Sequence, residues 1–485
     1  MTKKFFITTP IYYVNDVPHI GHTCTTIAAD ILARYHKLLG EDVFFLTGTD
    51  EHGNKVAQEA AAAGLTPKEF CDKVSRSFKE IWPKLNIQYD YFIRTTDPRH
   101  EKIASAVVQK LYDKGYIYKG MYEGFYCLGC EKFLNEKDLM DGKCPLHPNK
   151  EPQHQKEENY FFKLSSFKDV LIKAISDPND PNHYEILPES KKKEVLSKLK
   201  EGVDDISISR EKVSWGIPCP WDKKHTIYVW VEALLNYYTA TQFVPGKKDF
   251  WPADLHTMAK DILWFHTVIW EALLIAADLP VPKQIFIHSF YLIDGQKMSK
   301  SLGNVISPQQ LLEKFGADAT RYLIASSFPF DKDSNVGLQK FTEKYNADLA
   351  NGLGNLVARV TKLCENNNLQ FSPIDLSIFR SIETNKILQA VDSFLREYKL
   401  SEALTVIWMA IKGLDSYIDK ERPWELTSSE AKKRLDIIIR GSESIRSLLE
   451  IAYALAPFMP ETAKKIEKQF SGPKIISSTS LFPRI

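Results

Sequence analysis

The sequence predicts an α/β domain followed by a separate all-helical domain, and three features lead to this prediction. A buried strand, a helix and a second buried strand follow one another by residue 47. From about Gly115 to Trp221 the composition shifts to Gly, Cys, Pro and charged residues, which indicates an insertion. Beyond about Tyr345 the apolar residues recur at helical spacing. A chain of 485 residues has room for roughly two to four domains.

The first of these features predicts a βαβ unit of an open sheet. Phe5–Thr9 and Val43–Thr47 indicate buried strands, and Gly40 ends the helix that begins near His22. Ligands bind beyond the carboxyl ends of strands in such sheets, so we expect a site at residues 9–22 and 47–54. The helical stripe consists of Ile27, Ile31, Tyr35 and Leu38, widened by Leu32 and Leu39.

Further strand and helix patterns define the rest of the predicted domain organisation. Strand patterns resume at Thr226–Trp230 and Gln284–His288. One C-terminal helix carries the apolar stripe Ile407, Ala410, Ile411, Leu414 and Ile418. The predicted divisions are two sheet halves at 1–115 and 226–295, an insertion at 116–225, a junction at 296–345 and a helical domain at 346–485.

Composition and charge exclude several functional classes. The N-terminus lacks an apolar signal core, and Ile262–Ala277 is too short and too interrupted to span a membrane, so we expect a cytoplasmic protein without membrane contact. The net charge of +1 is not that of a generic nucleic-acid binder. Residues 346–485 hold 19 Lys and Arg against 17 Asp and Glu, a difference of +2. Any RNA contact there must therefore depend on individually placed side chains.

Two short motifs point to phosphate chemistry. The run His19-Ile20-Gly21-His22 stands at the predicted start of the first helix, where backbone N–H groups and the helix dipole favour phosphate. Residues 297–301, Lys-Met-Ser-Lys-Ser, form a cationic loop between turn residues, which suits a triphosphate. Each motif alone is also compatible with a surface histidine pair or a solvated lysine loop.

Together, in this order and at the ends of the two sheet halves, the motifs resemble the paired signatures of class I aminoacyl-tRNA synthetases, over nearly the whole chain. The resemblance implies a Rossmann-type catalytic domain that binds ATP with Mg²⁺. The separation of 278 residues between His19 and Lys297 leaves no room for the editing domain of the leucyl, isoleucyl and valyl enzymes. The implied ATP-binding residues are His19, Gly21, His22, Lys297, Ser299 and Lys300, of which His19, His22, Lys297 and Lys300 are also catalytic.

The insertion carries a pattern typical of a zinc knuckle. Cys127 and Cys130 form one ligand pair and, after thirteen residues, Cys144 and His147 form a second. Four protein ligands close a tetrahedral site, so we expect one structural Zn²⁺ rather than a catalytic one. Free buried cysteines are the alternative. The pattern resembles the knuckle of the methionyl-tRNA synthetase family of the single-zinc type.

Two further runs, 229–237 and 261–266, resemble the methionine-pocket segments of that family. A thioether is polarizable and packs well on aromatic rings, although aromatic residues at such spacing are often plain core. The resemblance implies that Asp50 binds the substrate ammonium and that Arg210 pairs with Asp50; a purely structural pair is the alternative. The expected methionine-binding residues are Ile11, Tyr13, Asp50, Arg210, Trp230, Ala233, Leu234, Tyr237, Ile262 and His266.

In the helical domain, the run from Asn351 to Arg359 resembles the first anticodon-binding helix of the family, with Asn355 and Arg359 on one face. Trp424 matches a tryptophan on which an anticodon base stacks, although it would otherwise be taken for core. The resemblance implies activation of L-methionine with ATP and its transfer to elongator and initiator tRNA(Met). Because no dimerisation domain follows the bundle, we expect a monomer.

Three other functions compete with this prediction. A cysteinyl-tRNA synthetase would bind the substrate thiolate on zinc, which four protein ligands disfavour. A non-catalytic tRNA-binding paralogue would be expected to lack signature histidines or lysines, yet all are present. A nucleotidyltransferase without tRNA would leave the helical domain without a role.

Overall fold

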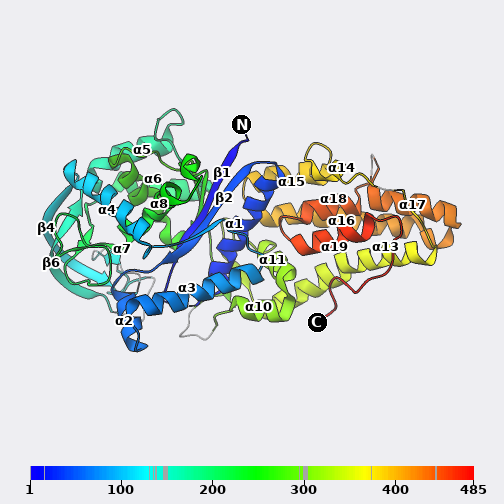
Figure 1. The fold of residues 1–485 in the computed structure, drawn as a ribbon, viewed down its shortest axis with the longest axis horizontal. Helices are drawn as coiled ribbons and strands as arrows, with labels where there is room; N and C mark the ends of the chain where they lie inside the picture. The colour runs from blue at the N-terminus through cyan, green and yellow to red at the C-terminus, as the bar shows by residue number, and fades with distance from the viewer. Residues whose placement is uncertain are drawn as a thin grey trace.

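The computed structural model describes most of the chain. It covers residues 2–15, 17–129, 132–134, 136, 139–145, 151–293, 295–298, 304–372, 374–442 and 445–485. Four of the predicted site residues, Cys130, His147, Ser299 and Lys300, lie outside this part, and of Lys297 only the backbone is described. Figure 1 shows an elongated molecule with an α/β body at one end and a helical body at the other.

The α/β body is built on a parallel sheet. Among the described residues the strand order is β3-β2-β1-β11-β12-β7, and every neighbouring pair is parallel. The chain leaves β1 toward β2 on one side and returns to β11 on the other, so a topological switch point lies between β1 and β11. The strands are β1 (Lys4–Tyr13), β2 (Asp42–Asp50), β3 (Tyr91–Arg94), β7 (Glu185–Leu187), β11 (Leu255–Ala259) and β12 (Gln284–His288).

Both faces of this sheet are buried, which explains why its strands are nearly continuous apolar runs. In β1, Phe5 and Ile7 point into one core with α1 and α3, while Phe6 points into the opposite core with α4, α8 and α9. The helices around the sheet are α1 (Ile20–Leu38), α2 (Asn54–Ala62), α3 (Pro67–Lys84), α4 (Pro98–Asp113), α7 (Val229–Leu234), α8 (Asn236–Phe243) and α9 (Trp270–Ala276).

A second, antiparallel sheet has the order β5-β4-β6-β8, and in Figure 1 its strands β4 and β6 lie at the end of the α/β body remote from the helical body. The predicted insertion also supplies β7 to the main sheet, so the segment 116–225 contributes to both sheets. Its elements are β4 (Ile117–Cys127), β5 (Lys132–Leu134), β6 (Gln153–Phe162), α5 (Lys168–Ser176), α6 (Glu189–Glu201) and β8 (Ile206–Ser207), followed by the pair β9 (Ser209–Arg210) and β10 (Thr226–Ile227).

The prediction of a strand at Thr226–Trp230 is wrong. Of these five residues only Thr226 and Ile227 belong to a strand, and the helix α7 begins at Val229. The β-branched and aromatic residues favour a strand locally. The buried side chain of Glu232, hydrogen-bonded to two histidines of other segments, is satisfied in the helix. Tertiary contacts therefore override the local preference.

A junction joins the sheet to the helical body. It contains β13 (Tyr291–Ile293), β14 (Gln296–Lys297), β15 (Ser334–Val336), α10 (Pro308–Phe315), α11 (Ala317–Ala325) and α12 (Leu338–Lys344). The helical body starts with a π-helical segment at Tyr345–Gly354 and continues with α13 (Asn355–Asn366), α14 (Ser377–Arg380), α15 (Lys386–Arg396), α16 (Leu400–Glu421), α17 (Ser428–Arg440), α18 (Leu448–Leu455) and α19 (Pro460–Phe470). The predicted α/β domain followed by a helical domain is confirmed. No helix in the described ranges is long and apolar enough to cross a membrane.

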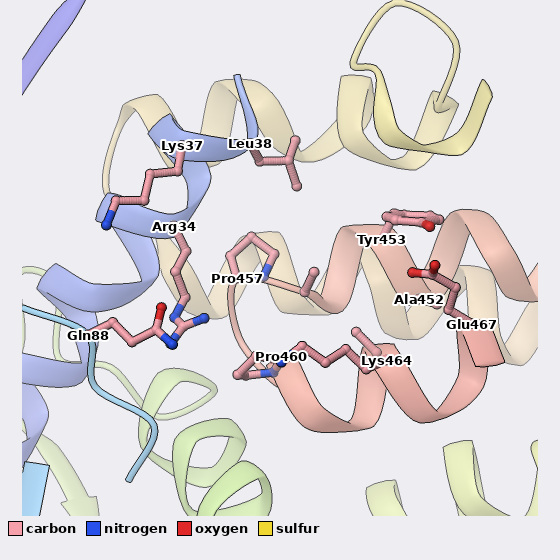
Figure 2. A pocket seen from close by; sticks show the side chains of 12 residues that line it. Arg34, Lys37, Leu38, Gln88, Ala452, Tyr453, Pro457, Pro460, Lys464 and Glu467 are labelled. Atoms are coloured by element: carbon pink, nitrogen blue, oxygen red, sulfur yellow. The ribbon is translucent and has the colours of Figure 1, made fainter. Parts of the chain in front are cut away.

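The buried side chain of Arg321, on α11, connects the two bodies. It forms an ion pair with Asp30 of α1 at 2.7 Å and donates to the carbonyls of Pro457 and Phe458, both at 2.8 Å. Beside this contact lies a crevice of about 280 Å³, lined by Arg34 and Lys37 of α1 and by residues of α18 and α19 (Figure 2). The bodies therefore meet along α1, the helix whose N-terminus carries the first motif.

Candidate active site

The first motif caps the N-terminus of α1. His19 is the N-cap residue, with extended backbone, and its Nδ1 accepts from the N–H of Gly21 at 3.1 Å. Nδ1 of His22 accepts from the N–H of His19 at 3.4 Å, which completes a reciprocal cap. A Cβ on Gly21 would lie 2.9 Å from the imidazole of His19, so a larger residue here would displace that ring. The predicted start of this helix near His22 is confirmed to within two residues.

These hydrogen bonds define the tautomers of both histidines. Because Nδ1 of each ring accepts a backbone N–H, the proton of the neutral ring resides on Nε2. The rings of His19 and His22 stack with centroids 3.7 Å apart. Burial, and then the neighbouring His19, hold the pKa of His22 well below its usual value. His22 is therefore a neutral hydrogen-bond donor at physiological pH.

The second motif lies against the first. The side-chain methyl of Met298 is 3.6 Å from the position of a Cβ on Gly21. After the motif, the carbonyl of Ile306 accepts from the N–H of Ile20 at 2.9 Å. The structure thus brings together at one helix start two motifs that are 278 residues apart in sequence.

Several of the predicted methionine-binding residues contact one another, since His266 is hydrogen-bonded to Tyr237 and to Ile262 and lies edge-on to the ring of Trp230. Ala233, Leu234, Tyr237 and His266 are buried. Trp230 stacks on Phe265 with centroids 4.0 Å apart. Four members are only partly buried while packed against the same core, as the rim of an apolar site would be: Ile11, Tyr13, Trp230 and Ile262.

His266 and Tyr237 form a defined hydrogen-bonded pair in this group. Nδ1 of His266 donates to the carbonyl of Ile262 at 3.1 Å, so its Nε2 accepts from the hydroxyl of Tyr237 at 2.9 Å. Burial lowers the pKa of His266 to about 4. The pair is therefore neutral at physiological pH, which suits an uncharged side chain as ligand.

Asp50 ends β2 and lies in register with Tyr13 of β1. Its side chain is buried. Arg210 is also buried; it donates to Glu157 at 3.0 Å and to Gln155 at 2.8 Å, and its guanidinium lies over the ring of Tyr126. The predicted pairing of Arg210 with Asp50 stays a prediction.

The structure also contains a buried charged cluster that no local sequence pattern predicts. Glu232 accepts from Nδ1 of His52 at 2.8 Å and from Nε2 of His100 at 3.0 Å, and all three side chains are buried. Although burial opposes ionisation, Glu232 and Glu101 raise the pKa of His52 to about 10. His52 is therefore an imidazolium paired with a buried carboxylate. The only sequence signal is a histidine two residues after Asp50.

Two of the four predicted zinc ligands lie in the described part of the chain. Cys127 at the end of β4 and Cys144 are both about 1% exposed and belong to one small cluster with Leu134. Their partners Cys130 and His147 lie outside the described residues. The described pair is consistent with a closed knuckle.

The predicted anticodon residues come together at the far end of the helical body. Arg359 of α13 lies over the ring of Trp424, 5.1 Å from its centroid, and donates to Asp415 and Asp419 of α16. Asn355 is exposed one turn earlier on α13. Trp424 is 48% exposed, so the alternative of a core tryptophan is wrong.

Comparison with known proteins agrees with this geometry. A family model described as tRNA synthetases class I (M) matches residues 5–151 and 139–361. The chain belongs to this family.

The relatives specify the kind of synthetase. A protein named methionine–tRNA ligase from Clostridium acetobutylicum is 44% identical over 100% of this chain and 78% of its own length. One of the same name from Thermotoga maritima is 41% identical over 96% of this chain and 75% of its own. The solved structure of Mycobacterium tuberculosis methionyl-tRNA synthetase in complex with methionyl-adenylate superposes with a TM-score of 0.89 at 33% identity, covering 100% of both chains. The resemblance inferred from the motifs is confirmed.

Proposed function

We propose that this protein is a methionine–tRNA ligase. It joins L-methionine and ATP to form methionyl-adenylate and pyrophosphate, and then transfers the methionyl group to the 3′-terminal adenosine of tRNA(Met), elongator and initiator alike. The observation that carries the proposal is the contact between the two motifs at the start of α1, beside an apolar aromatic site at the switch point of the sheet.

In the activation step, a methionine carboxylate oxygen attacks the α-phosphorus of ATP, and the bond from that phosphorus to the bridging oxygen breaks to release pyrophosphate. Nε2 of His19 and Nε2 of His22 donate hydrogen bonds to phosphate oxygens as charge develops. Lys297, Ser299 and Lys300 bind the same phosphates from the second motif. Mg²⁺ bound with ATP would share the phosphate charge. No side chain of the protein becomes covalently attached, so positioning dominates catalysis.

The methionine site has two ends. Asp50 binds the ammonium group, and Arg210 orients that carboxylate. Trp230, Tyr237 and the apolar residues around them hold the thioether, where aromatic contacts are worth about 0.3–1.5 kcal/mol each. The neutral pair of His266 and Tyr237 places no charge near the sulfur, which disfavours charged amino acids.

The helical body reads the anticodon. Trp424 offers a half-exposed ring on which a base stacks, and Arg359 and Asn355 offer hydrogen bonds to base edges. The ion pairs of Arg359 with Asp415 and Asp419 hold its guanidinium over the tryptophan before RNA arrives. The near-neutral charge of this body fits recognition by a few placed groups.

Cys127, Cys130, Cys144 and His147 would hold one structural Zn²⁺. The two described thiols support this because Cys127 and Cys144, each the first member of a ligand pair, are buried in one small cluster. Four protein ligands leave no position for substrate on the metal, so zinc stabilises the insertion and takes no part in the reaction. The domain divisions, the monomeric state and the cytoplasmic location remain predictions.

Charging of tRNA(Met) transcript with radiolabelled methionine tests the proposal. We expect ATP-dependent incorporation into the acid-precipitable tRNA fraction, with one pyrophosphate released per methionine transferred. A protein that forms methionyl-adenylate yet never charges tRNA would be a nucleotidyltransferase of the competing kind.

A further inference from the structure

We propose that Glu232 is a positioning residue for methionine, which acts through His52 to set the separation between the two ends of the methionine site. The inference rests on the proposed function. Glu232 lies on α7 between Trp230 and Ala233, which hold the side chain of methionine in that proposal. His52 lies two residues after Asp50, which binds its ammonium group. The hydrogen bond from His52 to Glu232 therefore joins the segments that grip the substrate at opposite ends.

The segment from Asp50 to Gly53 is anchored residue by residue. The carbonyl of Asp50 accepts from the N–H of Val14 at 3.1 Å. Glu51 receives two hydrogen bonds from Arg94, at 2.6 and 2.8 Å. These anchors tie the segment to β1 and β3, within its own half of the sheet. The bond of His52 to Glu232, at 2.8 Å, ties the segment to α7, from the second half of the α/β domain.

The helix α7 depends on the same bond. It spans only the six residues Val229–Leu234, and its N-cap residue Tyr228 makes no side-chain capping hydrogen bond. The carboxylate of Glu232 is fully buried and receives one ring N–H from His52 and another from His100. The other nitrogen of His100 bonds to the hydroxyl of Thr239 on α8, at 2.8 Å. Glu232 thus fixes α7 to the segment that follows β2 and to α4.

Replacing the carboxylate of Glu232 by an amide of the same shape should be enough to disturb this positioning role. A glutamate accepts at both oxygens, whereas a glutamine of the same shape presents one acceptor and one donor. Glu232→Gln therefore keeps the volume but loses one of the two accepted ring N–H groups, together with the charge opposite His52. Leaving a buried charge without its counter-charge strongly favours rearrangement of the segment that carries it.

The test is methionine-dependent ATP–pyrophosphate exchange by the full-length Glu232→Gln variant. Small displacements of a substrate-binding group cost up to about a hundredfold, so we expect KM for methionine to rise about ten- to a hundredfold. KM for ATP should stay within about twofold, because the phosphate-binding motif at α1 makes no contact with this cluster. If Glu232 were only structural, Glu232→Gln would lower the amount of active enzyme but would not raise KM for methionine more than KM for ATP.

The matched control is Glu101→Gln. Glu101 faces the same histidine from the other side, at 3.7 Å, with its side chain 41% exposed, and this variant should keep both KM values. If Glu232→Gln does not fold, His52→Gln tests the same link with the same expected separation. An unchanged KM for methionine, or an equal rise for both substrates, would overturn the inference. Wild-type protein without methionine-dependent exchange would instead refute the proposed function.

Discussion

Replacing Trp424 by alanine should weaken tRNA charging while leaving methionine activation intact. The ring is 48% exposed and lies about 5 Å under the guanidinium of Arg359. An exposed cation–π contact is worth about 0.5–1 kcal/mol, and half of the ring is already in solvent, so the variant should fold with little loss of stability. The functional cost should therefore greatly exceed the structural one.

The magnitude follows from base stacking. Loss of one stacked base costs about 1–3 kcal/mol, which at about 1.4 kcal/mol per decade corresponds to roughly a five- to hundredfold fall in kcat/KM for tRNA. The proposed anticodon site lies in the helical body, whereas the proposed site of adenylate formation lies in the α/β body, so pyrophosphate exchange should be unchanged. Trp424→Phe keeps an aromatic face and should retain most of the activity.

The assay compares aminoacylation and pyrophosphate exchange on the same preparations. Met409→Ala is the matched control. Met409 is a large residue of the same helical body, it is 67% exposed, and it does not belong to the proposed RNA site. Charging at the wild-type rate by Trp424→Ala, or a parallel loss of exchange and charging, would refute the anticodon role of Trp424.

Three further predictions concern catalysis, stability and the metal. His22→Ala should slow adenylate formation by about 10²–10³-fold in single turnover with little change in methionine affinity; since the pKa of His22 lies well below its usual value, the wild-type rate should not fall as pH rises through about 6.5. Burial raises the pKa of Glu271 well above its usual value, and its carboxylate has no hydrogen-bond partner among the described residues. The protonated carboxyl of Glu271 is therefore favoured in the folded state, so the stability linked to its protonation is fully present below about pH 4 and is lost as pH rises. Glu271→Gln should accordingly raise Tm at pH 8 and leave Tm unchanged near pH 4. Metal analysis should find one zinc per chain, with none after Cys127→Ser; two zincs per wild-type chain would contradict the knuckle.

The strands and helix around the first motif were predictable because their signals are local. β1, β2 and β12 are continuous apolar runs, and α1 has a clear stripe ended by Gly40, which has a φ of 80°. β11 was missed, since Leu255–Ala259 includes a histidine and a threonine whose burial depends on partners elsewhere, such as the bond between Thr8 and His256. β7 was missed because three residues carry too little pattern.

The residues of the candidate site likewise fall into those that local sequence patterns predict and those that they do not. The two phosphate-binding motifs and the aromatic runs could be recognised because their residues are close together in sequence. The cluster of His52, His100 and Glu232 could not, since its members come from three segments and no local pattern marks a glutamate as buried. The same cluster explains why Thr226–Trp230, predicted as a strand, continues into a helix.

The most direct test of the account is ATP–pyrophosphate exchange by the purified protein with each of the twenty amino acids in turn. We expect methionine to support exchange at a kcat/KM far above that of every other amino acid, because in the proposed site a buried carboxylate binds the ammonium group and a neutral aromatic lining holds the thioether. Exchange supported best by cysteine, or exchange without any amino-acid dependence, would contradict it.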